Sequence, residues 1–257
     1  MRYLALLKAF GLALGLAGLA LAWAMPASAS DYAREKKWAD EVTPAVLTGD
    51  PVWLELSSGH KFLTLYTEAE AAKAKAKVGL ILIHGMGVHP DWGLIGPLRQ
   101  QLPEHGYATL SIQMPVLKAD AKGDDYPATF DEATERIKTA VAFMTAKGYR
   151  KVALVSHSMG SRMAARYLER NPESGVAAWV AIGASAALDY SKLKIPVLDL
   201  YGENDLPQVL TTAKARAKGL HGHAGSAQRI VPKADHFFEG KDKPLLEAVQ
   251  AFLDKTL

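Results

Sequence analysis

Cysteine is absent from this chain of 257 residues. Disulfide bonds are therefore excluded even in an oxidising compartment, where they normally form. Side-chain packing alone must hold the folded domain together. A lipoprotein is also excluded, because lipid attachment at the amino terminus requires a cysteine.

The chain also lacks an excess of charge of either sign. It has 30 lysine and arginine residues against 27 aspartate and glutamate residues, a formal net charge of +3. Two positive charges, Arg2 and Lys8, lie in an amino-terminal segment without acidic residues, so the rest of the chain carries +3 − 2 = +1. This balance argues against a nucleic-acid partner. No internal repeat is visible either.

The amino terminus has the three parts of an export signal. Arg2 and Lys8 belong to a positive segment, and an apolar stretch rich in leucine, alanine and glycine follows over residues 9–25. Ala27-Ser28-Ala29 then offers small residues for cleavage after Ala29. The alternative is an uncleaved anchor, because a stretch of roughly 17 residues is near the lower limit for crossing a bilayer. The small residues favour cleavage.

We therefore expect residues 1–29 to be a signal peptide and residues 30–257 to form a single domain of 257 − 29 = 228 residues. This length is sufficient for one substantial core. Cleavage places the protein in the periplasm or outside the cell, without stable insertion in the membrane. The sequence gives no indication of an oligomeric state.

Hydrophobic patterning predicts a sheet that starts with a hairpin and continues with parallel strands. Residues 52–56 and 61–67 alternate apolar and polar side chains around a short turn, which indicates an antiparallel hairpin. Beyond the charged segment 68–77, which we expect to be a solvated connection, short apolar runs alternate with helical patterns. We expect strands at 78–83, 107–112, 152–155, 176–182, 197–201 and 228–231, and helices at 32–40, 94–102, 129–147, 161–170 and 244–253.

This order of elements predicts an α/β protein with a mostly parallel central sheet flanked by helices on both faces. One helix start is also predicted in detail, because Thr129 and Glu132 have the spacing of a capping box.

Ser158 follows the expected strand 152–155 within Ser156-His-Ser-Met-Gly160 and precedes a helix. A strand, a sharp turn bearing serine and a helix form the nucleophile elbow of serine hydrolases. The turn needs small residues beside the nucleophile, and Ser156 and Gly160 meet that need. Ser156 replaces the first glycine of the usual motif, which adds a second candidate hydroxyl at the end of the strand.

Two further residues follow strand ends in the order that a catalytic triad of this kind requires. Asp205 comes just after the strand 197–201, and His236 comes after the strand 228–231. Parallel strands place their carboxyl ends at one edge of the sheet, so Ser158, Asp205 and His236 are expected to converge there. His236 is then the base that activates Ser158, and Asp205 orients the imidazole.

Two backbone N–H groups are the expected oxyanion donors. One belongs to Met159, which follows Ser158, and the other to Met86 in the glycine-rich turn His84-Gly-Met-Gly87 after the strand 78–83.

Each of these residues has a structural alternative. Glu203 is a weaker rival for the acid, and His84 is expected to pack or form hydrogen bonds beneath the Gly85 turn. His157 has no required role, and Asp235 is expected to point to solvent. His221 and His223 alone are weak evidence for a metal, so we expect neither a metal nor a cofactor.

Four motifs together resemble the α/β-hydrolase superfamily over about residues 52–257. They are His84-Gly-Met-Gly87, Ser156-His-Ser-Met-Gly160, Gly202-Glu-Asn-Asp205 and Ala234-Asp-His-Phe-Phe238. The segments His89-Pro-Asp-Trp92 and 95–111 look like those of an exported bacterial family of unknown function. The superfamily resemblance implies ester or related acyl hydrolysis without a cofactor, and the closer family implies no substrate.

Many relatives carry a helical cap after the strand corresponding to 176–182, but here only about a dozen residues, 182–195, are available. We therefore expect an open site without a large cap domain. The expected lining residues are Trp92, Tyr126, Leu206 and Phe237, and the loop 115–127 can overhang the pocket.

The resulting hypothesis is an exported, cofactor-independent serine esterase acting on a small-molecule ester or acyl substrate. A non-catalytic binding module of the cell envelope is one alternative. An acyltransferase that uses the same triad with an acceptor other than water is another.

Overall fold

The structure is a computed structural model that describes residues 30–70 and 77–257. The expected signal peptide, residues 1–29, and most of the charged connection, residues 71–76, lie outside the described residues. In the part that is described, no helix combines the length and the apolar character needed to cross a membrane.

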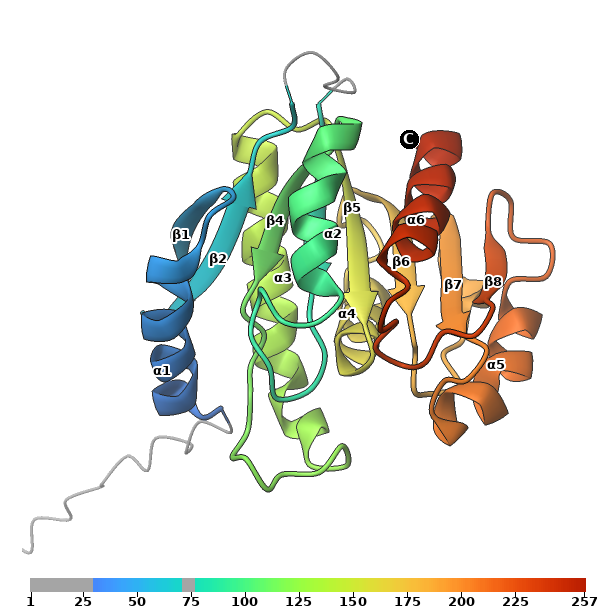
Figure 1. The fold of residues 1–257 in the computed structure, drawn as a ribbon, viewed down its shortest axis with the longest axis horizontal. Coiled ribbons are helices and arrows are strands. Elements are labelled where there is room, and N and C mark those ends of the chain that lie inside the picture. The colour runs from blue at the N-terminus through green and yellow to red at the C-terminus, as the bar shows by residue number, and fades with distance from the viewer. Residues whose placement is uncertain (1–29, 71–76) are drawn as a thin grey trace, which may run out of the picture.

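Within these residues eight strands form a single sheet in the order β1-β2-β4-β3-β5-β6-β7-β8 (Figure 1). The strands are β1 (Asp50–Glu55), β2 (Lys61–Thr67), β3 (Val78–Ile83), β4 (Ala108–Ile112), β5 (Lys151–His157), β6 (Val176–Ile182), β7 (Val197–Gly202) and β8 (Ala227–Val231). β1 and β2 pair antiparallel, and β2 also pairs antiparallel with β4. All other neighbours are parallel. The predicted hairpin and the mostly parallel sheet are confirmed.

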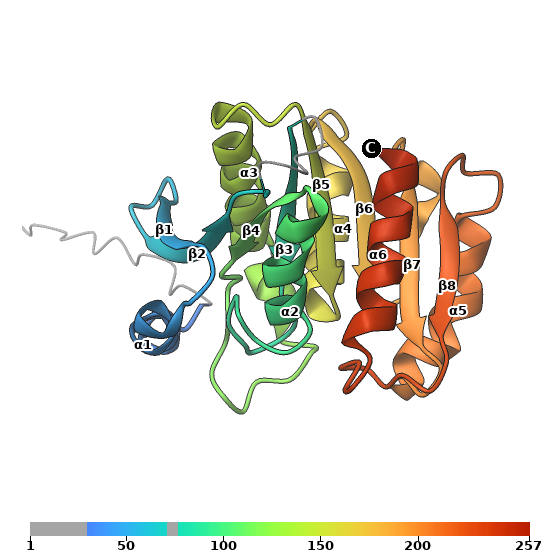
Figure 2. The ribbon, with the colours of Figure 1, turned by 45° about the horizontal axis from the view of Figure 1, so that its top comes forward.

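Helices cover both faces of the sheet (Figure 2). They are α1 (Tyr32–Val42), α2 (Ile95–Gln101), α3 (Phe130–Ala146), α4 (Met159–Arg170), α5 (Pro207–Gly219) and α6 (Asp242–Thr256). α3 and α4 pack on one face, and α2 and α6 pack on the other. This arrangement is the α/β-hydrolase fold that the sequence predicted.

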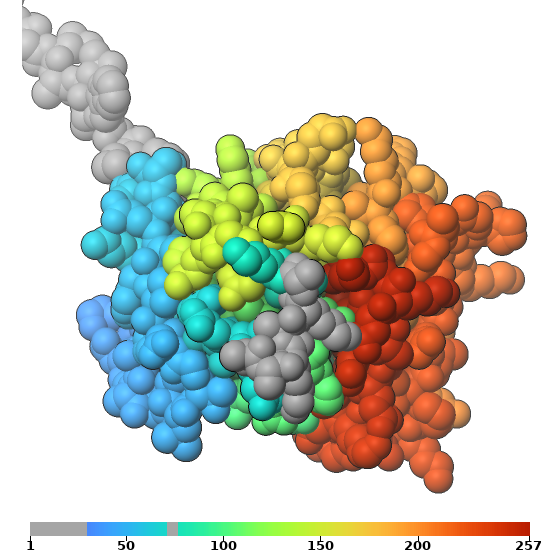
Figure 3. All heavy atoms as spheres, turned by 90° about the horizontal axis from the view of Figure 1, so that it is seen from above, coloured from blue at the N-terminus to red at the C-terminus, as the bar shows by residue number. Residues whose placement is uncertain are grey.

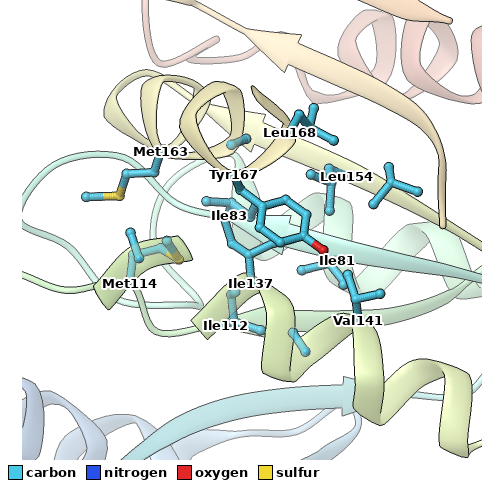
Figure 4. Close-up of a cluster of buried hydrophobic side chains, with 14 of the residues drawn as sticks. Ile81, Ile83, Ile112, Met114, Ile137, Val141, Leu154, Met163, Tyr167 and Leu168 are labelled. Carbon is cyan, nitrogen blue, oxygen red and sulfur yellow. The ribbon is translucent and has the colours of Figure 1, made fainter. Parts of the chain in front are cut away.

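The central parallel strands, such as β3, β5 and β6, have mainly apolar sequences because both of their faces are buried. Every residue of β3 is buried, for example. Side chains of alternate strand positions meet the helices of one face in a close-packed cluster (Figure 4). Its labelled members are Ile81, Ile83, Ile112, Met114, Ile137, Val141, Leu154, Met163, Tyr167 and Leu168.

The amino-terminal and carboxyl-terminal parts of the domain lie far apart in the molecule (Figure 3). Seen from above, the amino-terminal hairpin and the carboxyl-terminal elements lie at opposite sides (Figure 3). α1 packs on the outer part of the sheet, where Ala39 and Val42 join Leu63 and Leu65 of β2 in a small apolar cluster.

One local prediction is wrong, and one helix was missed. The capping box does not form, because the Thr129 hydroxyl donates to the Tyr126 carbonyl while Glu132 pairs with Arg136. A 3-10 helix over Tyr126–Thr129 leads directly into α3, so Thr129 already has helical backbone angles and is not placed to cap. The helix α5 was not predicted at all.

Candidate active site

The sharp turn between β5 and α4 carries Ser158. Its backbone angles, φ 53° and ψ −118°, lie where residues other than glycine are rarely found. Such strain is typical of functional sites. The backbone N–H of Ser158 donates to the Ile182 carbonyl at 2.9 Å, which ties the turn to β6.

Gly160 is required because another backbone segment crosses it closely. A Cβ atom at this position would lie 2.4 Å from the His84 carbonyl oxygen. Only glycine lets the first turn of α4 approach the loop after β3 in this way. The tight fit brings the loop after β3 beside Ser158, as the parallel pairing of β3 with β5 also requires.

Ser156 serves the structure of the elbow. It is fully buried, and its hydroxyl accepts a hydrogen bond from Trp179 Nε1 at 2.8 Å and contacts the Ser161 hydroxyl at 2.9 Å. The second candidate hydroxyl is therefore engaged inside the protein and does not face the pocket.

The structure brings Ser158, His236 and Asp205 into one hydrogen-bonded chain. His236 Nε2 lies 2.9 Å from Ser158 Oγ, and His236 Nδ1 lies 2.6 Å from Asp205 Oδ1. An ionised carboxylate can only accept, so Nδ1 carries the proton and Nε2 is free to accept from the Ser158 hydroxyl. This is the tautomer that a general base needs.

Asp205 is held in its ionised form. Burial disfavours the charge, but the hydrogen bond from His236, the attraction to that imidazole and the backbone N–H groups of Leu206 and Gly202 outweigh burial and lower the pKa of Asp205. Glu203, the rival acid, instead accepts a hydrogen bond from the Lys233 N–H at 2.8 Å.

The loop after β3 is oriented by His84, which is fully buried. The Met114 N–H can only donate, so His84 Nε2 accepts from it at 2.9 Å and the ring proton sits on Nδ1, 2.8 Å from the Gly85 carbonyl. In a trans peptide the C=O and N–H groups point in opposite directions. His84 therefore draws the Gly85 carbonyl inward and turns the Met86 N–H outward, toward the pocket side of the turn.

Neither expected oxyanion donor is used by the fold. The N–H groups of Met86 and Met159 form no backbone hydrogen bond among the described turns and loops. Met159 begins α4, and a Cβ at Gly85 would lie 3.4 Å from Ser158 Cβ, so the two segments flank the serine. The arrangement can stabilise an oxyanion formed at Ser158.

His157 has a contact that sequence reasoning did not find. It is buried, and its Nε2–H donates to the backbone carbonyl of His236 at 3.0 Å. Burial lowers the pKa of His157 to about 3, so the ring is neutral and adds no positive charge beside His236. No signal in the sequence distinguishes this histidine from a neighbour without a role.

A pocket of about 430 Å³ opens onto Ser158. Trp92, Leu206 and Phe237 line it as expected, and so do Gly123 and Asp124 of the predicted overhanging loop. Tyr126 does not. Only 1% of it is exposed, and its hydroxyl lies beneath the loops, where it accepts from the Leu117 N–H.

The pocket has no cap, as predicted. Between β6 and β7 the chain forms only a short 3-10 helix, Tyr190–Lys192. In the described part of the chain, no group of three or more histidine, cysteine, aspartate or glutamate side chains is placed to hold a metal ion. His223 is occupied by the Leu193 carbonyl and the Ser226 hydroxyl.

Arg34 and Arg162 are two further residues at the site that sequence reasoning missed. Arg34 of α1 donates to the carbonyls of Leu117 and Gly87, at 2.8 and 3.0 Å, and thereby joins the two loops beside Ser158. Arg162 lines the pocket itself. The sequence could have indicated Arg162 as a pocket residue, because it follows Ser158 by one helical turn. The role of Arg34 depends on tertiary packing alone and has no such signal.

Solved structures with this fold include several hydrolases. A serine hydrolase without a lid from Xanthomonas campestris is 17% identical, with a TM-score of 0.63, over 82% of this chain and 96% of that chain. Est1E from Butyrivibrio proteoclasticus is 15% identical, with a TM-score of 0.64, over 80% and 98%. A dienelactone hydrolase from Anabaena variabilis is 21% identical, with a TM-score of 0.64, over 80% and 97%. At these identities the likeness shows the fold.

No protein with a curated description matches the chain. A family model described as a protein of unknown function (DUF3530) matches residues 47–133 and 118–255. These two matches span nearly all of the described domain, including all three residues of the hydrogen-bonded chain at the pocket. The protein therefore belongs to the DUF3530 family, and its fold is that of the α/β hydrolases.

Proposed function

We propose that this protein is a serine hydrolase that cleaves carboxylic esters through an acyl-enzyme intermediate. The observation that carries the proposal is the continuous chain from Ser158 Oγ through His236 to Asp205, with separations of 2.9 and 2.6 Å. A non-catalytic module would have no need for His236 to face Ser158, so this geometry favours catalysis over binding alone.

The reaction follows from the positions of the three side chains. Ser158 Oγ attacks the carbonyl carbon while His236 Nε2 takes the hydroxyl proton, and Asp205 stabilises the imidazolium. The N–H groups of Met86 and Met159 hold the oxyanion. When the ester C–O bond breaks, His236 returns the proton to the leaving alcohol. Water then attacks the acyl-enzyme with His236 again as base, and releases the acid and free Ser158.

The walls of the pocket favour an accessible ester with apolar groups. Met86, Trp92, Leu206 and Phe237 line the pocket and are 36–50% exposed, and no cap encloses them. A neighbour in fold, Est1E, is described with ferulic acid bound, and another is called a dienelactone hydrolase. These names are consistent with ester chemistry on this fold.

The expected site of action is the periplasm or the exterior of the cell, because of the signal peptide predicted over residues 1–29. The proposed steps use only side chains and backbone groups of the chain itself, so the reaction requires no cofactor. If an alcohol replaced water in the second step, the same site would act as an acyltransferase.

Hydrolysis of 4-nitrophenyl acetate and 4-nitrophenyl butyrate tests the proposal. The folded protein is expected to hydrolyse both, and Ser158→Ala and His236→Gln to lower kcat by roughly a thousandfold or more. Ser161→Ala is a matched control, because Ser161 is a buried serine on the same turn that contacts Ser156. Activity equal to that of the wild type in Ser158→Ala would overturn the assignment.

A further inference from the structure

Arg162 places a positive charge within the wall of the Ser158 pocket. It lies four residues after Ser158 on α4, which is about 6 Å along the helix axis. Both residues line the same pocket, and Arg162 is half-buried. Its side chain is therefore within reach of a substrate that is bound at the serine.

The guanidinium of Arg162 has little to bind within the protein. Its one hydrogen bond to a described residue is a long contact of 3.4 Å from Nη1 to the Gly123 carbonyl, and the guanidinium lies over the Phe130 ring, 5.6 Å from its centre. Among the described residues no carboxylate forms an ion pair with it. The fully buried arginines differ in this respect, because Arg99, Arg136 and Arg216 are each paired with a carboxylate.

The other charge on the pocket wall is Asp124, which is exposed at the surface of the overhanging loop. Solvent screens an exposed carboxylate much more than a half-buried guanidinium. The amino-terminal end of α4 adds partial positive charge in the same region. Arg162 is therefore the less screened of the two charged side chains that line the pocket, while the large side chains around the opening are apolar.

We propose that Arg162 is the anion-binding residue of this pocket, so that the preferred ester carries a carboxylate a few bonds from its scissile carbonyl. The planar guanidinium suits a carboxylate, which it can bind through two parallel hydrogen bonds. The remainder of the substrate is apolar and contacts the rim. This inference rests on the proposed esterase function and specifies its substrate class.

The expected preference is large enough to measure. A charge-assisted hydrogen bond in a partly buried site changes binding by roughly 10- to 100-fold. The quantity to compare is the selectivity ratio, which is kcat/KM for a carboxylate-bearing ester divided by kcat/KM for its neutral carboxamide analogue. Comparing this ratio between variants cancels the intrinsic reactivity of each ester.

Two pairs of substrates place the charge on either side of the scissile bond. In 3-acetoxybenzoate and 3-acetoxybenzamide the difference lies in the leaving group. In monoethyl adipate and the ethyl ester of adipic acid monoamide it lies in the acyl group. A drop in the ratio for either pair in Arg162→Gln supports the proposal and identifies the side that faces Arg162.

Three variants distinguish the effect of the positive charge at position 162 from the effect of the shape of its side chain and from a change in overall charge. Arg162→Gln is expected to lower the ratio by roughly 10- to 100-fold for one pair. Arg162→Lys, which keeps the charge without the planar fork, is expected to be intermediate. Arg166→Gln is the matched control on the same helix, because Arg166 lies outside this pocket and should leave the ratio unchanged.

Failure of this inference is distinct from failure of the esterase proposal. If the neutral esters are hydrolysed and Arg162→Gln leaves both ratios at the wild-type value, the anion subsite is overturned and the esterase stands. If Arg166→Gln lowers the ratio as much as Arg162→Gln, the effect is one of overall charge and the subsite is again overturned.

Discussion

At the scale of residues, the contacts of Ser156, His84 and His157 could not be deduced from residue type alone. The nucleophile elbow tolerates Ser156 in place of glycine because the buried Ser156 hydroxyl forms hydrogen bonds with Trp179 and Ser161. His84 and His157 were expected to have only a structural role or none. In the structure each fixes a backbone carbonyl next to a reacting group, Gly85 in one case and His236 in the other.

The role of His84 leads to a prediction about kcat. His84→Leu removes the donor to the Gly85 carbonyl, so the peptide that bears the Met86 N–H loses its orientation. We expect kcat to fall by about tenfold to a hundredfold, somewhat less than the loss of an oxyanion donor outright, with little change in KM. Steady-state kinetics with a neutral ester measures this change.

His84→Asn is the matched variant, because its side-chain amide can donate from nearly the same position as Nδ1. It is expected to retain more of kcat than His84→Leu does. Equal activity of His84→Leu and wild type at matched folded fractions would show that this hydrogen bond does not position the oxyanion donor.

At the scale of elements, α1 acts as a brace for the loops of the site. Arg34 joins the Gly87 and Leu117 carbonyls, and its guanidinium lies over the ring of Trp38 at 4.5 Å. α1 itself packs on β2 through a small apolar cluster. The helix therefore connects the outer part of the sheet with the two loops beside Ser158.

Arg34→Met is expected to lower the free energy of unfolding by about 2 kcal/mol, because two hydrogen bonds from a charged donor are lost. It should also speed proteolysis in the loop over residues 115–127, which loses one of its attachments. Urea unfolding and limited proteolysis measure the two effects. Lys36→Met is the control on the same helix, since its ion pair with Asp40 is exposed. Identical proteolysis of the Arg34 variant and wild type would argue against the brace.

The helix α5 shows why one element escaped sequence analysis. Helices such as α3 and α6 were predicted because several apolar side chains recur with helical spacing on their buried faces, in α3 even beside the buried Arg136. The buried face of α5 consists of Val209, Ala213 and Arg216. Two apolar residues are too few to display a helical repeat, and only Pro207 at the start of the helix offered a local signal.

Arg216 and Asp199 of β7 are both fully buried and paired at 2.9 Å. Arg216→Met leaves the Asp199 carboxylate buried without its cation, so we expect a loss of about 3–5 kcal/mol in the free energy of unfolding. Adding Asp199→Asn to this variant removes the uncompensated charge and should recover part of the loss. A double variant less stable than Arg216→Met would contradict this explanation.

The mostly parallel sheet and the convergence of the site residues were within reach of the sequence, because the carboxyl ends of parallel strands lie at one edge of a sheet. Ser158, Asp205 and His236 each follow a strand, so the geometry that the structure shows was predictable. The position of Tyr126 was not, because it depends on how the loop over residues 115–127 folds back beneath Gly87. Contacts between loops, such as those of Arg34, have no periodicity that a sequence can display.

For the whole molecule, the buried histidines predict how stability depends on pH. Burial lowers the pKa of both His84 and His157 to about 3. In the unfolded chain each titrates near its ordinary pKa of about 6.5. Between these values the unfolded state binds protons that the folded state does not, so stability is fully present above about pH 6.5 and falls as the pH is lowered toward 3.

For each buried histidine, we expect the free energy of unfolding to fall by about 1.4 kcal/mol for each pH unit. This slope reaches its full value about one pH unit below the ordinary pKa of 6.5. Urea unfolding at intervals between pH 7.5 and pH 5 measures it. His157→Gln should remove the contribution of one buried histidine from this slope. His221→Gln, at an exposed position, should leave the slope unchanged. A free energy of unfolding that stays constant from pH 7.5 to pH 5 would contradict the buried, neutral state of both rings.

The whole account depends on Ser158 being an activated nucleophile, and covalent labelling tests this most directly. The folded protein, treated with a fluorophosphonate probe, is digested and the modified peptide identified by mass spectrometry. The account predicts one label per chain, on Ser158, lost in Ser158→Ala and strongly slowed in His236→Gln. Absence of labelling in the folded wild type, or undiminished labelling of Ser158→Ala, would contradict it.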